Sequence, residues 1–234
     1  MEIRIAVSKI DKFGSGNSGD TVEVIERPNG GISVVMADGQ INAKDHKSIS
    51  TLVSHRVIDH ISHGVRDGAA IRATNSRIFA EHQGNVRADL NVISVDLQTN
   101  TILISRNNPV PVFLIDEEKV ECLDTESDPI GWQEEITPSI VELRIRPNMA
   151  IIAFSDGVFF AGRENQQKTD ICTIIEGLIE EQEPFAQEIA DFLLSRSIRL
   201  DDGRPKDDMS VIVLLVSPES NDIIRRMNVS FTIS

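Results

Sequence analysis

Aromatic residues are scarce in this chain of 234 residues, which has no tyrosine, one tryptophan and nine phenylalanines. Stacking of nucleic-acid bases on tyrosine and tryptophan side chains is therefore not expected. Basic residues are also few, since 23 lysines and arginines stand against 37 aspartates and glutamates and give a formal net charge of −14. This charge opposes binding to phosphate backbones and to anionic membranes. We therefore expect neither a nucleic-acid partner nor a membrane partner.

Long apolar runs and cysteine motifs are missing too. No stretch reaches the roughly 20 apolar residues that cross a bilayer, and the N-terminal MEIRIAVSKID has no signal-peptide pattern. Cys122 and Cys172 form no CxxC pair, and their apolar neighbours predict buried structural thiols. The expected location is the cytoplasm.

The chain does contain many short runs of β-branched and apolar residues, separated by turn residues. The Asn29-Gly30 pair between two such runs is a hairpin signal. The runs predict strands over residues 3–10, 21–27, 32–37, 90–97, 101–107, 109–115, 119–123, 139–145, 149–155 and 210–217, and one further strand within 223–233.

Helical spacing of apolar residues occurs in four places. It predicts a helix over 44–62 and a second over 67–82, with Asp67 as its cap and Gly84 as its stop. Two more helices are expected over 171–181 and 186–199. Blocks of strands alternating with pairs of helices predict an α+β fold, a four-layer αββα sandwich in which two antiparallel sheets pack face to face with helices on the outer faces. We expect one domain over residues 1–234, with 218–234 as a C-terminal extension strand.

Aspartates border four of the apolar runs. They are Asp20, Asp38 followed by Gly39, Asp156 followed by Gly157, and Asp207 followed by Asp208. Each alone also fits a turn or a solvated loop. Together at neighbouring strand ends, such carboxylates raise one another's pKa unless cations neutralise them. Carboxylate oxygens suit magnesium, manganese or calcium, so the joint pattern predicts a two-metal hydrolase. The clustered loop motifs of a calcium-binding structural protein are absent from the sequence.

The order of these pieces is Gly-Asp, ADGQ after a strand, a helical pair, a β-meander, FSDGV, a second helical pair and DDMSVIVL. It resembles the metal-dependent protein phosphatases (the PPM family), and most closely the small single-domain bacterial members of the SpoIIE-type branch. The resemblance implies a bacterial serine/threonine phosphoprotein phosphatase with two divalent cations, Mn²⁺ or Mg²⁺. It also implies a phosphorylated signalling regulator of the anti-anti-sigma (STAS) type as substrate.

The resemblance further assigns roles to residues. Asp38 would bridge both metals, the Gly39 carbonyl would help hold one, and Asp156 and Asp207 would ligate the second. Asp38, Asp156 and Asp207 would thus be the catalytic set. Asp20 would contact the metal site through water, and Asp208 would orient the ligands.

The chain departs from the family where many members have a histidine after Asp-Gly to protonate the leaving group. Here Gln40 follows, and glutamine cannot act as an acid. His46 is a conceivable substitute, or a surface histidine without a role. The departure motivates an alternative function, a phosphatase-like regulator that binds a phosphoprotein or a kinase without turnover. Arg106 is left outside the catalytic set, so no phosphate-binding arginine is assigned.

Overall fold

The computed structural model describes residues 1–41, 46–116, 119–163, 171–180, 185–218 and 224–230. One sheet contains, in spatial order, β1 (Glu2–Ile10), β10 (Met209–Ser217), β9 (Ala150–Phe154), β6 (Val112–Asp116) and β7 (Lys119–Leu123). The other contains β2 (Asp20–Glu26), β3 (Ile32–Ile41), β4 (Val86–Asp96), β5 (Thr101–Asn107) and β8 (Ser139–Arg144). All neighbouring strands are antiparallel.

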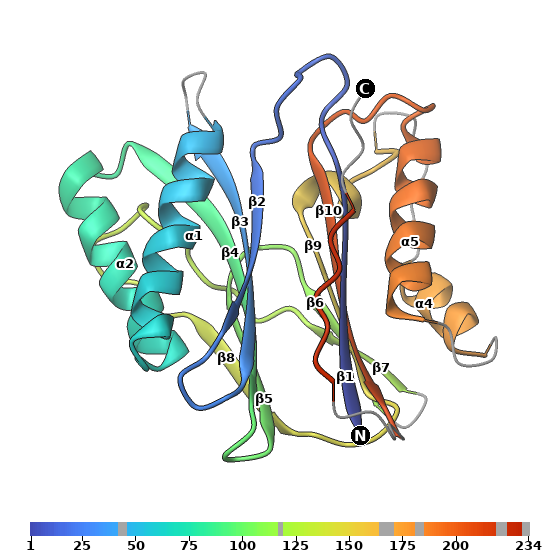
Figure 1. Ribbon diagram of the computed structural model, residues 1–234. Helices are drawn as coiled ribbons and strands as arrows, with labels where there is room; N and C mark the ends of the chain where they lie inside the picture. Colours follow the sequence, from blue (N-terminus) through green and yellow to red (C-terminus); the bar gives the residue numbers. More distant parts are fainter. Residues whose placement is uncertain (42–45, 117–118, 164–170, 181–184, 219–223, 231–234) are drawn as a thin grey trace.

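The two sheets pack face to face and helices cover both outer faces (Figure 1). Helices α1 (His46–Ser62) and α2 (Asp67–His82) lie on the sheet whose edge strands are β2 and β8, called here the β2–β8 sheet. Helices α4 (Ile171–Glu180) and α5 (Ala186–Leu200) lie on the other sheet. Each interface has its own apolar core, and the core between the sheets joins residues such as Val34 and Ile93 to Ile151 and Ile212. The predicted αββα sandwich is therefore confirmed.

Local expectations from the sequence are mostly confirmed. The hairpin at Asn29-Gly30 joins β2 to β3, with Gly30 at φ 85°, and the helix over 67–82 has the predicted bounds. The helix expected over 44–62 is described from His46, and residues 44–45 lie outside the described residues. A short helix, α3 (Asp156–Phe159), follows β9 and was not predicted.

Two expectations were wrong. Cys122 is exposed, because β7 is an edge strand in which no residue is buried; the burial of Cys172 lies outside what the structure describes. Asp67 is not the cap of α2, since Arg66 occupies that position and makes no side-chain cap bond.

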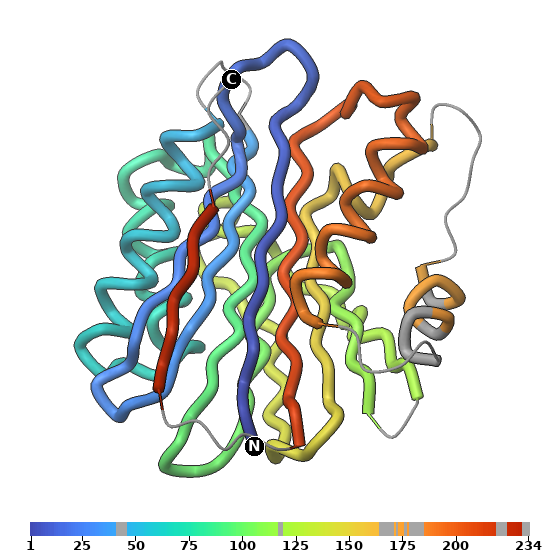
Figure 2. Tube along the Cα trace, turned by 45° about the vertical axis from the view of Figure 1, so that its right-hand side comes forward, coloured from blue at the N-terminus to red at the C-terminus, as the bar shows by residue number. Residues whose placement is uncertain are grey.

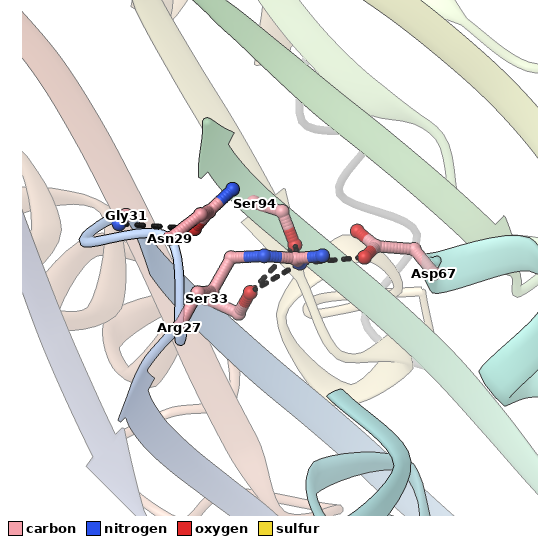
Figure 3. Close-up of polar contacts among 6 residues, drawn as sticks. All are labelled: Arg27, Asn29, Gly31, Ser33, Asp67 and Ser94. Atoms are coloured by element: carbon pink, nitrogen blue, oxygen red, sulfur yellow. Dashed lines mark hydrogen bonds and ion pairs between the residues drawn. The ribbon is translucent and has the colours of Figure 1, made fainter. Parts of the chain in front are cut away.

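Asp67 instead forms a buried ion pair with Arg27, drawn in Figure 3. The Arg27 guanidinium donates to Asp67 Oδ1 at 2.6 Å and to the hydroxyls of Ser33 at 3.0 Å and Ser94 at 2.9 Å. The Asp67 side chain is 0 % exposed. The contact joins the β2–β3 hairpin and β4 to the first residue of α2, so it fixes where that helix starts on the sheet.

The C-terminal segment 224–230 is not part of a strand, and all seven of its residues are exposed. Figure 2 shows this segment, in red, returning along the side of the sandwich where β1 and β2 lie. The rest of the predicted extension strand, at 223 and 231–233, lies outside the described residues, so a strand is not confirmed there.

Candidate metal centre

Three aspartates form a row across the β2–β8 sheet. Asp20 on β2 lies directly opposite Asp38 on β3, and Asp38 lies directly opposite Asp89 on β4. Directly opposed residues of antiparallel strands project from the same face. Met36, two residues before Asp38, belongs to the core between the sheets. Because strand side chains alternate with a period of two, all three carboxylates face the space between the sheets.

The facing sheet contributes aspartates at the ends of two adjacent strands. Phe154 on β9 pairs with Val211 on β10, so Asp156, just after β9, and Asp207, just before β10, share one sheet edge. The two sheets are joined here by Ser210, whose hydroxyl donates to Asp20 Oδ2 at 2.6 Å. The site is thus built from both sheets.

In both Asp-Gly pairs, the backbone of another segment lies too close to the glycine to leave room for a side chain. A Cβ on Gly39 would lie 2.2 Å from the carbonyl oxygen of His46, in the first turn of α1. A Cβ on Gly157 would lie 2.2 Å from the carbonyl oxygen of Asp208. Only glycine fits such contacts without displacement, so each glycine lets a neighbouring segment pack next to a site aspartate.

The aspartates repel one another strongly. Burial, followed by the charges of Asp20, Asp156, Asp89 and Asp207, raises the pKa of Asp38 well above its usual range. Burial and the charge of Asp207 also raise the pKa of Asp156. Four other carboxylates thus act on Asp38, an arrangement that requires protons or cations for neutrality.

The two outer members of the row show the same effect. Burial raises the pKa of Asp20 to about 6, and burial with the nearby charge of Asp156 raises that of Asp89 to about 7. Asp20 is 0 % exposed, and its Oδ1 atom has no hydrogen-bond partner in the described part of the chain. An unpaired buried carboxylate oxygen costs free energy unless a ligand satisfies it.

These donors fit hard divalent cations, because all of them are oxygens and their summed charge is strongly negative. Among the residues that the structure describes, no three His, Cys, Asp or Glu side chains are already arranged around one common ion position. The strand register puts Asp20, Asp38 and Asp89 in one row, and Asp38, Asp156 and Asp207 open onto one cleft. Like charges without a cation between them repel and stay apart, which accounts for the missing convergence.

The Asp208 carboxylate binds the backbone of the loop that precedes Asp20. Its Oδ1 accepts from the backbone N–H of Lys12 at 2.8 Å and its Oδ2 from that of Gly19 at 2.7 Å. Both oxygens are therefore occupied by backbone donors, and Asp208 fixes the β1–β2 connection against the start of β10.

A cleft of about 630 Å³ opens onto Asp38, Asp156 and Asp207 and is bordered by Gln40 and His46, among others. The Gln40 amide donates to Asp89 Oδ2 at 3.1 Å. His46 Nδ1 lies 2.8 Å from the Gly39 carbonyl oxygen, which can only accept, so Nδ1 carries the proton. The tautomer with an unprotonated Nε2 is therefore favoured for the neutral ring.

Asp89 is the member of the acidic row that the sequence analysis missed. The strand expected over 90–97 begins at Val86, so Asp89 lies inside it rather than before it. An acidic residue within a strand that is otherwise buried was the available signal. Arg106 is 2 % exposed and donates to the carbonyls of Asn108 and Val110, so its guanidinium is engaged inside the fold.

No described helix has the length and apolar composition that a membrane crossing requires.

Solved structures of other proteins share the architecture described above. The chain is similar over 92 % of its length to the solved PP2C phosphatase domain with a regulatory fragment of SpoIIE from Bacillus subtilis, at 22 % identity and a TM-score of 0.78, covering 64 % of that chain. It is also similar to the catalytic domain of the serine/threonine protein phosphatase PstP in complex with 2 manganese ions, at 18 % identity and a TM-score of 0.71, covering 92 % of this chain and 98 % of that one.

A curated relative, stage II sporulation protein E of Priestia megaterium, is 26 % identical over 209 residues, which cover 88 % of this chain and 35 % of that protein. The chain thus spans about a third of the length of this relative. The model of the family described as Stage II sporulation protein E (SpoIIE) matches residues 28–217, a range that holds Asp38, Asp89, Asp156 and Asp207. This match extends over most of the sequence, and the chain belongs to the SpoIIE family.

Proposed function

We propose that the chain is a metal-dependent serine/threonine phosphoprotein phosphatase that uses two divalent cations, Mn²⁺ or Mg²⁺. The observation that carries the proposal is the position of Asp38, which lies between the buried Asp20 and Asp89 on its own sheet and shares a cleft with Asp156 and Asp207 of the facing sheet. Family membership and the two manganese ions of the PstP relative support it.

Asp38, the Gly39 carbonyl, Asp156 and Asp207 would hold the cations, and Asp20 and Asp89 would complete the site from either side. Divalent cations bound there would lower the pKa of a coordinated water and neutralise charge on phosphoryl oxygens. The remaining groups position this set. Ser210 orients Asp20 through its 2.6 Å hydrogen bond. Such supporting partners typically change metal affinity or activity by about 10- to 100-fold when removed.

For the substrate, we propose a phosphorylated bacterial signalling regulator of the anti-anti-sigma (STAS) type in the cytoplasm. The support is membership of the SpoIIE family. The chemistry of the cleft requires only a phosphomonoester that can reach the carboxylates.

The first test is hydrolysis of para-nitrophenyl phosphate by purified protein in Mn²⁺, Mg²⁺ or EDTA, with Asp38→Asn as the control. Turnover that depends on the metal and is lost in the variant is the expected result. No turnover with any metal, in protein that is folded and binds Mn²⁺, would contradict the proposal.

One observation favours the alternative, a phosphatase-like regulator without turnover. The residue after Asp38-Gly39 is a glutamine whose amide is engaged with Asp89, so this position supplies no acid for the leaving group. Stable binding of a phosphorylated STAS-type protein, with the phosphate still present after prolonged incubation with Mn²⁺, would support the regulator.

A further inference from the structure

The chain's one tryptophan supports an arginine at the outer end of the β2–β8 sheet. The Arg87 guanidinium carbon lies 3.1 Å from the centroid of the Trp132 ring. Trp132 is brought there because Ile130 exchanges two backbone hydrogen bonds with Ala88, of 2.9 and 2.8 Å. Stacking on an aromatic face restricts the plane of a guanidinium and leaves its N–H donors around the rim.

Arg87 lies on the same face of the sheet as Asp38 and Asp89, two residues before Asp89 and close to the start of β4. Asp38 is opposite Asp89, and two pairs further along β3 and β4 Gln40 is opposite Arg87. Gln40 borders the cleft and donates to Asp89. The positive charge of Arg87 lowers the pKa of Asp89, against the larger effects of burial and Asp156. The charge of the Arg87 guanidinium therefore acts on the acidic row at Asp89.

No acidic partner neutralises this arginine in the described part of the chain. Arg27, Arg56, Arg77 and Arg146 each form an ion pair with an aspartate or glutamate, whereas no ion pair and no hydrogen bond of the Arg87 guanidinium occurs among the described residues. A fixed guanidinium with unused donors suits a planar pair of oxygens from a ligand.

We propose that Arg87, held on Trp132, binds an oxyanion of the substrate next to Gln40, where that residue borders the cleft, either the phosphoryl group or an acidic side chain beside it. This inference rests on the proposed phosphatase function.

The tryptophan fluorescence of the protein reports binding near Trp132 independently of turnover, because the chain has no other tryptophan. Wild-type protein in Mn²⁺ is titrated with inorganic phosphate in one series and with an unphosphorylated acidic peptide in another. We expect a saturable fluorescence change in at least one series, and the responding series identifies the oxyanion. Arg87→Lys, which keeps the charge and loses the planar fork, should weaken that binding about 10-fold, and Arg87→Ala about 10- to 100-fold.

Arg163→Lys is the matched control, because Arg163 stacks on Phe160 at 3.5 Å in the segment after α3 and has no place in the row of β3 and β4 residues that holds Asp38, Asp89 and Arg87. It should bind both probes as the wild type does. In steady-state assays with a phosphoserine peptide, the Arg87 variants should raise KM by a similar factor and change kcat little. Thermal melting confirms that each variant is folded before it is compared.

The inference and the phosphatase function can fail separately. Fluorescence titrations that are unresponsive, or identical in wild type and both Arg87 variants, would overturn the role of Arg87 even in an active enzyme. Binding that depends on Arg87 in a protein that hydrolyses nothing would keep the anion site and remove the phosphatase.

Discussion

Asp20 and Asp38 lie directly opposite each other on β2 and β3, with both carboxylates buried and facing the second sheet. Two ionised carboxylates at this spacing repel each other, and Asp89 continues the row on β4. A metal-free protein therefore stores electrostatic repulsion at one end of its core, which predicts how stability and activity respond to substitution, pH and metal.

Asp38→Asn should raise the stability of the metal-free protein and abolish its activity. It removes the carboxylate at the centre of the repulsion, so in EDTA we expect a higher melting temperature than the wild type, by about 2–4 °C for each kcal/mol relieved. Metal-dependent hydrolysis should be lost. A lower melting temperature in EDTA would show that Asp38 is stabilised by contacts other than those described.

Asp89→Asn tests the residue that only the structure revealed. We expect its affinity for Mn²⁺, measured by calorimetry, to fall about 10- to 100-fold while the fold is retained. Asp96→Asn, at the solvated end of the same strand, is the control and should bind Mn²⁺ normally. Unchanged affinity in Asp89→Asn would place Asp89 outside the metal site.

The metal-free protein should lose stability as pH rises. The folded-state pKa of Asp20 is about 6 and that of Asp89 about 7, both above the ordinary value of 3.8. Between these values the folded state binds more protons than the unfolded state, so the free energy of unfolding decreases with pH. The decrease begins near pH 4 and ends near pH 7, and Asp20 alone contributes on the order of 3 kcal/mol.

Urea unfolding in EDTA at pH 5 and pH 8 measures this effect, and saturating Mn²⁺ should abolish it by stabilising the ionised carboxylates. Equal stability at both pH values without metal would contradict the raised pKa values.

Arg27→Ala should destabilise the protein by about 3–5 kcal/mol, because it leaves the buried Asp67 carboxylate without its partner. Urea unfolding followed by circular dichroism provides the measurement. Arg77→Ala, which removes an ion pair of a 71 % exposed side chain, is the control and should change little. Equal effects of the two substitutions would mean that the Arg27–Asp67 pair does not hold α2 on the sheet.

His46→Ala should lower kcat by a similar factor at every pH. The Nδ1–H bond to the Gly39 carbonyl holds the ring against the turn that follows Asp38, so we expect His46 to position that carbonyl rather than to act as an acid. A pH–rate profile that loses one limb in His46→Ala would instead identify His46 as the general acid.

Much of the fold was predictable because its signals are local. Apolar alternation predicted nearly every strand, the Asn29-Gly30 pair predicted the hairpin, and helical spacing gave the bounds of α2. The two Asp-Gly pairs indicated the acidic cluster, since a charged residue followed by glycine after an apolar run is visible in the local sequence; β3 itself continues past Asp38 to Ile41. The role of Asp67 was misread, because a helix-terminal aspartate has the same sequence signal whether it caps the helix or pairs with a distant arginine.

The sequence by itself determined the layered α+β architecture and the acidic strand ends, because hydrophobic period and turn chemistry act over a few residues. Only the tertiary structure decided which carboxylates meet. Strand register placed Asp89 beside Asp38, and the packing of the two sheets brought Ser210 to Asp20 across 190 residues of sequence. The contacts of Asp208 with the β1–β2 loop and of Arg87 with Trp132 have the same origin. Such contacts arise from the way whole sheets pair and pack, which no short stretch of sequence encodes.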